Sequence, residues 1–381
     1  MAALRVLVLI GSASLTAGGA ERQVDYLLRN MPAERVAFRL ACFEASRDDV
    51  DRIARVGVAV DILSSTPRRL WPLRFLARVL SIVRRHDIEI VQAFLPTFDI
   101  LAPTLRLFAP DLRVVTSRRN VDEQLSSGEL RGLKITGRLA TGIVANSQAV
   151  AESVRRIEGD PQGRLHVIPN GLILPPPVDA SQRKGARQTL GLADDEFVIV
   201  YIAHFRDGKG HVHLPGVVDA VVRRVPHARF LLAGDMNKNR GHILNAAAFG
   251  EAVDRLGASH KVRCLGLVPD SRLLLAAADA SLNLSDVEGM SNALMESMAL
   301  GVPVVATEAG GVREMVADGA EGWIIARGDV ATAVERLVDL AGAPEIRRRV
   351  GEAARARIAR DFSIERMVDS YARLYERLTR G

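Results

Sequence analysis

Residues 285–308 read SDVEGMSNALMESMALGVPVVATE, and this stretch indicates both the fold class and the chemistry of the chain. A polar loop is followed by a helical pattern, by the valine-rich strand Pro303–Ala306 and by a Gly-Gly turn, which is the alternation of a parallel α/β sheet. Two acids are separated by seven residues: Glu288 in the loop and Glu296 about five residues into the helix, roughly 7 Å along its axis. Because ligands bind beyond the carboxyl ends of parallel strands, both acids are candidate binding residues.

The same alternation runs through the whole chain in two series. The first series predicts strands at Leu4–Ile10, Val36–Cys42, Ile88–Ala93, Arg113–Ser117, Gly142–Asn146 and His166–Ile168. The second series predicts strands at Phe197–Ala203, Ala228–Ala233, Lys261–Leu265, Ala280–Leu284, Pro303–Ala306 and Gly322–Ile325. We therefore expect an α/β protein with two Rossmann-like, doubly wound parallel-sheet lobes that face each other across a cleft.

The boundary between the lobes is predicted from LILPPPV at residues 172–178, because three consecutive prolines continue neither a helix nor a central strand. The predicted N-terminal lobe spans residues 1–175, and the helix at 363–381 packs back onto it. Residues 172–181 are the predicted linker. The predicted C-terminal lobe spans residues 182–362.

Composition restricts the class of protein. The 381 residues are 48% hydrophobic and 4% aromatic, which is typical of an α/β protein rich in Ala, Val and Leu. The net charge of +6 suits anionic ligands or an acidic membrane face, although biased genome composition also explains it. Two cysteines indicate no disulfide framework, and no apolar run is long enough to span a bilayer. We expect a cytoplasmic protein, with contact to the inner face of the cell membrane as a further hypothesis.

Two cations follow the first strand of the second series, in AHFRDGKGH. Arg206 and Lys209 lie on one short loop, where they can neutralise a diphosphate. Lys209 is one of only five lysines in a chain whose other basic residues are arginine. Its presence in a loop at the end of a strand therefore favours a role in ligand binding. The alternative is a pair of solvated loop cations.

Backbone groups of the predicted loops can also hold phosphate. Such a turn or helix start is predicted at Gly18 and Gly19, at Gly289, Met290 and Ser291, and at Gly310 and Gly311. The hydroxyl of Thr307 and the helix start at Val312 are further candidate phosphate donors. The Gly-Gly turns alone are weak signals, because glycine is common in turns.

The segment 67–85 contains a basic amphipathic helix. It has arginines near one face, and its predicted apolar face carries Leu73, Leu76, Ala77, Leu80 and Val83. Contact with anionic lipid is one hypothesis, and a helix that simply covers the N-terminal sheet is the alternative. The histidines at 204, 211 and 213 lack the further ligands of a metal site, so we predict no metal.

Nine segments, taken together and in order, resemble the family-4 retaining glycosyltransferases, which have the GT-B fold. They are GGAERQV, SRRN, VANSQAVAESV, VIPNG, FRDGKGH, FLLAGD, CLGLVPD, SDVEGMSNALMESMA and GVPVVATEAGGVREMV. The resemblance implies that Glu288 contacts hydroxyls of the donor sugar and that Glu296 binds ribose. It implies that Arg206 and Lys209 clamp the diphosphate and that the backbone of Val268 meets the base.

The same resemblance implies that Gly18 and Gly19 approach the donor phosphate. It implies transfer of a hexose or N-acetylhexosamine from a nucleotide-sugar, with a UDP-sugar favoured, to a glycan or lipid-linked acceptor. The reaction retains configuration and needs neither metal nor cofactor, and nucleic acid is not a partner. Cell-surface polysaccharide or glycolipid assembly is the implied setting. Two departures are that His204 stands where many relatives have Arg, and that VQAFLPTFDILA lacks a histidine common in relatives.

Three alternatives stay open. The first is a nucleotide-sugar 2-epimerase on the same fold. The second is a glycosidase that uses Glu288 and Glu296 as its carboxylate pair, although the phosphate-directed features would then have no purpose. The third is a non-catalytic sugar-nucleotide binding or scaffold protein, which would bind the donor without turnover.

Overall fold

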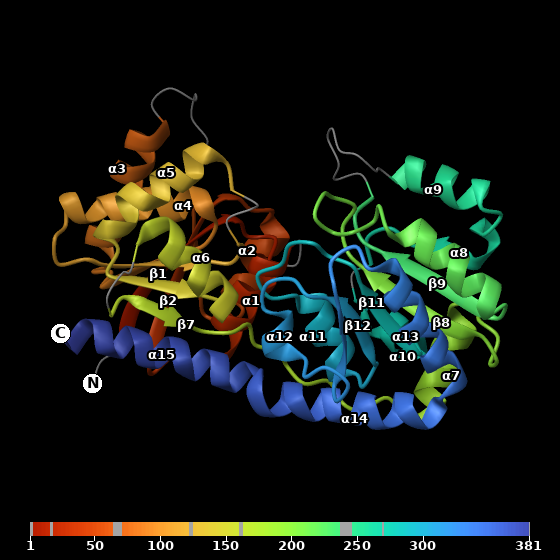
Figure 1. The fold of residues 1–381 in the computed structure, drawn as a ribbon. Coiled ribbons are helices and arrows are strands. Elements are labelled where there is room, and N and C mark those ends of the chain that lie inside the picture. Colours follow the sequence, from red (N-terminus) through yellow and green to blue (C-terminus); the bar gives the residue numbers. More distant parts are fainter. Residues whose placement is uncertain are drawn as a thin grey trace. The chain divides into compact units, whose positions relative to one another are not determined.

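The computed structural model describes residues 3–15, 18–63, 71–121, 125–159, 163–236, 246–268 and 270–380. The chain forms two compact units, each an α/β layer structure (Figure 1). Unit 1 comprises Met1–Gly171 and Phe362–Gly381, and unit 2 comprises Leu172–Asp361. The residues predicted as a linker, 172–181, therefore group with unit 2.

Unit 1 is built on a seven-stranded sheet in the described part of the chain, with the order β3-β2-β1-β4-β5-β6-β7 and parallel pairing throughout. Its strands are β1 (Leu4–Ser12), β2 (Val36–Glu44), β3 (Ala59–Ile62), β4 (Ile90–Ala93), β5 (Arg113–Arg118), β6 (Gly142–Ala145) and β7 (Leu165–Val167). Its helices are α1 (Gly19–Asn30), α2 (Arg47–Ala54), α3 (Trp71–Arg85), α4 (Pro96–Leu101), η1 (Ala102–Leu107), α5 (Ser127–Thr136), η3 (Gly137–Leu139), α6 (Gln148–Glu158) and α15 (Ile364–Arg380).

Unit 2 is built on a six-stranded parallel sheet in the described residues, with the order β10-β9-β8-β11-β12-β13. Its strands are β8 (Phe197–Ile202), β9 (Ala228–Ala233), β10 (Val262–Cys264), β11 (Ala280–Asn283), β12 (Val304–Thr307) and β13 (Gly322–Ile325). Its helices are α7 (Ala180–Thr189), α8 (Leu214–Arg224), α9 (Ala246–Arg255), η4 (Ser259–Lys261), α10 (Arg272–Ala277), α11 (Asn292–Ala299), α12 (Val312–Met315), α13 (Val330–Gly342) and α14 (Pro344–Asp361).

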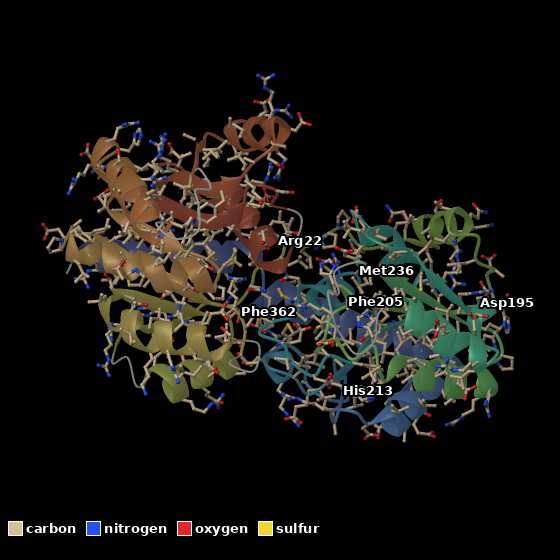
Figure 2. The ribbon with its side chains drawn as sticks, turned by 90° about the horizontal axis from the view of Figure 1, so that it is seen from above. Arg22, Asp195, Phe205, His213, Met236 and Phe362 are labelled. Carbon is tan, nitrogen blue, oxygen red and sulfur yellow. The ribbon has the colours of Figure 1, made fainter. Side chains whose placement is uncertain are left out.

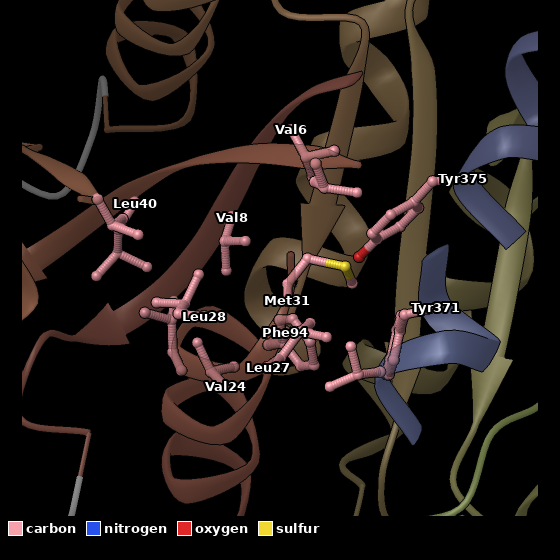
Figure 3. Close-up of a cluster of buried hydrophobic side chains, with 14 of the residues drawn as sticks. Val6, Val8, Val24, Leu27, Leu28, Met31, Leu40, Phe94, Tyr371 and Tyr375 are labelled. Carbon is pink, nitrogen blue, oxygen red and sulfur yellow. The ribbon is translucent and has the colours of Figure 1, made fainter. Parts of the chain in front are cut away.

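Both faces of the unit 1 sheet are covered by helices, which is why Val6–Ile10 of β1 is a continuous apolar run. Val6 and Val8 of β1 pack on the face covered by α1 and α15, whereas Leu7 and Leu9 pack on the face covered by α3 and α4. The C-terminal helix α15 belongs to this core, where it contributes Tyr371 and Tyr375 (Figure 3). The hydroxyl of Tyr375 donates to the side-chain oxygen of Gln92 at 3.1 Å.

The sheet of unit 2 is enclosed in the same way. Phe197, Ile199 and Tyr201 of β8 pack with α8 and α13 on one face. Val198 and Val200 pack with α7 and α10 on the other face. The alternation of side chains along β8 thus places a helical layer on each side, so this sheet exposes only its strand ends to a ligand.

The predicted α/β fold with two parallel sheets is confirmed. The predicted apolar face of α3 is only partly right, since Val83 is buried and Leu76 and Leu80 pack against the core, but Leu73 and Ala77 do not. The buried residues of α3 include Phe75, Val79 and Ile82, whereas Leu73 is 66% exposed and Ala77 is exposed. An aromatic cluster accounts for the difference, because Phe75 packs against Phe43 with a ring-centroid distance of 6.2 Å and against Phe98 at 5.7 Å. Large aromatic side chains contribute more to burial than leucine and alanine, so they determine the face that turns inward.

The short strand β3 was not among the predicted strands. The two cysteines are free, Cys42 buried and Cys264 exposed. Among the described residues, none of the helices combines the length and the apolar character that a membrane span requires.

Candidate functional site

The order of strands in unit 2 reverses between β8 and β11. Strand β8 pairs with β9 on one side and with β11 on the other, where Ala280 lies beside Ile199 and Ser281 beside Val200. In an open α/β sheet such a switch point is where ligands bind, because loops from adjacent strands diverge there. The predicted site residues Lys209 and Glu288 belong to the two loops that leave this point.

The loop after β8 is held in place by main-chain contacts. Phe205 and His213 bracket it (Figure 2). The Phe205 amide donates to the Asp235 carbonyl at 3.0 Å, and His204 Nδ1 accepts from the Asp235 amide at 2.9 Å. The hydroxyl of Tyr201 donates to the Lys209 carbonyl. His204, which stands where many relatives have an arginine, therefore joins this loop to the loop after β9.

Lys209 and Glu288 form an ion pair across the switch point. Lys209 Nζ donates to Glu288 Oε1, and the two side chains are only 12% and 10% exposed. The Asp286 amide donates to the Gly208 carbonyl at 2.9 Å, which joins the two loops next to the pair. A charge-assisted bond of this kind is stronger than a neutral one and fixes both side chains. Arg206, by contrast, is exposed and makes no ion pair with a described residue.

Two glycines allow the backbones of neighbouring loops to touch. Gly210 has φ +71°, and a Cβ built on it would lie 1.9 Å from the carbonyl oxygen of Leu284. Gly310 has φ +50°, and its Cβ would lie 1.8 Å from the carbonyl oxygen of Glu288. No other residue type fits either position without a shift of backbone. The loops after β8 and β12 therefore both pack directly on the loop that carries Glu288.

The loop after β12 makes hydrogen bonds to the loop that carries Glu288. The hydroxyl of Thr307 donates to the Ser285 carbonyl, and the Gly311 amide donates to the Gly289 carbonyl at 2.9 Å. Both groups were predicted as phosphate donors, and that role stays a prediction. The sequence does not show which carbonyl lies opposite a loop amide, so these two bonds were not predicted.

The second predicted acid lies on α11, which begins after the Glu288 loop. Ser291 is its N-cap, and its hydroxyl oxygen accepts from the Leu294 amide. Met290 is buried beside it. Glu296 Oε2 accepts a hydrogen bond from Ser271 Oγ at 2.5 Å. Sequence reasoning missed Ser271, because a serine before a helix is normally explained as a helix cap.

Val268 precedes Ser271 by three residues, on the segment between β10 and α10. Its side chain is half-buried and packs with the cluster that contains Leu274 and Leu275. Because Ser271 contacts Glu296, this segment runs beside the start of α11. The predicted base-binding and ribose-binding positions therefore belong to adjacent parts of unit 2.

Gly18 and Gly19 belong to unit 1. Gly18 is the N-cap of α1, and its carbonyl accepts from the Arg22 amide at 3.0 Å. The nearby segment that lacks a histidine contains Leu95, whose φ of +82° is unusual for leucine. It also contains the buried Asp99, which accepts from the Ser117 amide at 2.8 Å. That carboxylate supports the neighbouring strand β5.

His211 is buried directly behind the Lys209 loop. Its ring is 4% exposed and lies against Phe205 and Tyr201, with centroid distances of 4.0 and 5.2 Å. Neither ring nitrogen makes a well-aligned hydrogen bond with a described residue. Burial and, to a lesser extent, the positive charge of Lys209 together lower the pKa of His211 to about 4, and the nearby Ala203 backbone opposes this shift only weakly.

This buried histidine makes the stability of the fold depend on pH. Between pH 6.5 and pH 4 the unfolded chain binds a proton at His211 and the folded chain does not, so the free energy of unfolding falls as the pH falls. The expected loss is about 3 kcal/mol. In His211→Phe this part of the pH dependence disappears. Urea unfolding of both proteins between pH 7 and pH 4.5 measures the free energy of unfolding at each pH. If that free energy falls equally steeply with pH in wild type and variant, the pH dependence does not come from His211.

No group of three or more histidine, cysteine, aspartate or glutamate side chains gathers around a common point within the ranges that the structure describes. The polar groups that the described part of unit 2 presents near the switch point are an ion pair, an exposed arginine, a helix start and a second carboxylate.

Comparison with known proteins identifies the family. The model described as Glycosyltransferase Family 4 matches residues 17–174, and the model described as Glycosyl transferases group 1 matches residues 182–357. The chain is 31% identical over 199 residues to the EpsD protein of Bacillus subtilis (strain 168), covering 52% of this chain and 50% of that protein. It is 29% identical over 275 residues to the D-inositol 3-phosphate glycosyltransferase of Mycobacterium tuberculosis (strain F11), covering 70% and 52%. The chain spans about half the length of the curated relatives it matches.

Solved structures share the fold over nearly the whole chain. HepE of Anabaena, solved in complex with UDP-glucose, has a TM-score of 0.86 at 22% identity and covers 98% of this chain and 100% of its own. Sucrose-phosphate synthase of Thermosynechococcus elongatus has a TM-score of 0.83 at 17% identity and covers 98% and 99%. The two family models, in this order, account for most of both units. The chain belongs to glycosyltransferase family 4 and has the GT-B fold.

Proposed function

We propose that this protein is a retaining, metal-independent glycosyltransferase. It moves a hexose or N-acetylhexosamine from a nucleotide-sugar, with a UDP-sugar favoured, to a hydroxyl of a glycan or lipid-linked acceptor. The observation that carries the proposal is the partly buried Lys209–Glu288 ion pair at the switch point of unit 2. The likeness to HepE, whose structure holds UDP-glucose, supports a UDP-sugar as donor. Assembly of a cell-surface polysaccharide or glycolipid is the proposed setting.

The charges at this site suit the reaction. As the bond between the anomeric carbon and the phosphate oxygen breaks, positive charge develops on the sugar and negative charge on the leaving diphosphate. Lys209 and the exposed Arg206 neutralise the leaving group, with the start of α11 as a further donor. Glu288 accepts hydrogen bonds from hydroxyls of the donor sugar. These cations perform the task that a divalent metal performs in other transferases.

The same charges suggest how configuration is retained. The acceptor hydroxyl attacks the anomeric carbon on the face that the leaving group departs from, and its proton passes to an oxygen of the leaving phosphate. One C–O bond breaks and one forms, and no protein nucleophile takes part. The carboxyl group of Asp99 is engaged within unit 1, and the segment has no histidine, so we assign no catalytic residue there.

Thermal stabilisation by UDP, GDP, ADP and their sugars, each with and without EDTA, tests this function. A shift with one nucleotide family that EDTA leaves unchanged supports the donor site and the absence of a metal. A shift that EDTA abolishes contradicts metal independence, and the absence of any shift contradicts the donor site. Stabilisation by a nucleotide-sugar without turnover of any acceptor would identify a non-catalytic binding protein.

We also propose that the protein works in the cytoplasm and contacts the inner face of the membrane through α3. The exposed face of α3 carries arginines that make no ion pair with a described residue: Arg74, Arg78, Arg84 and Arg85. Uncompensated cations near an anionic bilayer contribute about 1 kcal/mol each.

Sedimentation with vesicles tests the membrane contact. Wild-type protein is expected to bind vesicles that contain phosphatidylglycerol and not vesicles of phosphatidylcholine alone. Reversing the charge of Arg74 and Arg78 to glutamate is expected to lower binding at least tenfold, following from about 1 kcal/mol per cation. The same charge reversal at the exposed residues Arg255 and Arg349 of unit 2 is the matched control. Equal losses in both double variants would exclude a specific role for α3.

A further inference from the structure

We propose that Ser271 is a positioning residue that orients the carboxylate of Glu296 toward the ribose hydroxyls of the nucleotide. This inference rests on the proposed function, in which Glu296 binds ribose. The Ser271 hydroxyl donates to Glu296 Oε2 at 2.5 Å, although the two residues are 25 positions apart in the sequence. The bond joins the segment after β10 to the second turn of α11.

The position of Ser271 makes this bond unusual. Ser271 is the N-cap of α10, where a serine hydroxyl normally accepts a hydrogen bond from an amide of the first turn. Here the side chain makes no capping bond. Asp270 Oδ1 instead accepts from the Arg272 amide at 2.8 Å, so one amide at the helix start is satisfied by the preceding residue. The serine hydroxyl is therefore directed at Glu296.

Packing fixes the helix that carries Glu296, and the bond from Ser271 acts on the side chain of this glutamate. Its neighbours Leu294 and Met295 are fully buried, so α11 is anchored firmly. The glutamate side chain is only half-buried, and it loses considerable rotamer freedom when it is held in one orientation. A hydroxyl that donates to a carboxylate forms a short, charge-assisted bond, which is strong enough to select one orientation before the ligand arrives.

The bond is compatible with binding of a vicinal diol. A carboxylate offers about four acceptor positions, so it can accept from Ser271 and from two ribose hydroxyls together. Without the Ser271 hydroxyl, the Glu296 carboxylate is still present but is no longer held in one orientation. The effect should therefore fall on ground-state binding of the nucleotide and not on the chemical step.

The test uses the full chain and whichever of UDP, GDP and ADP stabilises the wild-type protein. Ser271→Ala is expected to raise the Kd of this nucleotide and the KM of the donor about 5- to 20-fold, which is the order of magnitude of one net hydrogen bond. The value of kcat stays within about twofold. Ser271→Thr keeps the hydroxyl and is expected to restore the wild-type KM. Ser259→Ala, at an exposed serine of the same unit, is the matched control.

A double-mutant cycle with Glu296→Gln tests the positioning role of Ser271 separately from the ribose-binding role of Glu296. In the Glu296→Gln background, Ser271→Ala is expected to change the Kd less than twofold, because the serine acts through the carboxylate. If both single variants weaken binding but their effects add, or if Ser271→Ala alone has no effect, the positioning role is wrong. If Glu296→Gln itself leaves the nucleotide Kd unchanged, the ribose-binding role in the proposed function is wrong.

Discussion

Glu288→Ala is expected to lower kcat by about 10²-fold or more, the scale of one preorganised transition-state contact, while the Kd of the free nucleotide changes much less. The reason is that Glu288 faces the sugar and not the base or ribose in the proposed site. It also holds the ammonium group of Lys209, the proposed partner of the leaving diphosphate. Steady-state kinetics and nucleotide titration of the same preparation measure the two effects.

Two further variants define what this result means. Glu288→Gln keeps the shape and one acceptor oxygen but removes the charge and the second acceptor oxygen, so a similar loss of kcat would show that the full carboxylate is needed. Glu308→Ala removes an acid that pairs with Arg313 on the surface, where both side chains are about half exposed, and is expected to leave kcat unchanged. Wild-type turnover in Glu288→Ala would refute the site in unit 2.

Gly310→Ala is expected to destabilise the protein and to lower activity about 10²-fold, the scale of a misplacement near 1 Å. The new methyl group would lie 1.8 Å from the Glu288 carbonyl oxygen, so the backbone of one loop must move. The positive φ adds about 1–2 kcal/mol of strain for alanine. Urea unfolding and turnover measure the two consequences.

Gly319→Ala is the matched control for this substitution. Gly319 has φ +76° in the same unit, but nothing lies within 4 Å of the position that its Cβ would take. The Gly319→Ala variant should therefore lose only the stability that corresponds to backbone strain, and it should keep its activity. If the two variants lose equal stability and activity, the contact between Gly310 and Glu288 does not position the acid.

Much of the architecture could be predicted because its signals are local. A short, β-branched apolar run such as Val6–Ile10 favours a buried strand, and the structure has β1 at Leu4–Ser12. The four-residue strand β3 gave no comparable signal, because only β2 beside it makes it a strand. The family was confirmed from motifs of the same local kind, whereas the roles of the site residues remain predictions.

Local sequence patterns were enough to predict two parallel-sheet units, the loop positions of Lys209 and Glu288, and the helix that carries Glu296. These features follow from hydrophobic periodicity and turn residues, which act over a few positions. The pairing of Lys209 with Glu288, 79 residues away, and the bond from Ser271 to Glu296 became evident only in three dimensions. The same holds for the hydrogen bonds from Thr307 to the Ser285 carbonyl and from Gly311 to the Gly289 carbonyl. Partner choice depends on which groups face each other once the sheet has formed, and no local pattern encodes that arrangement.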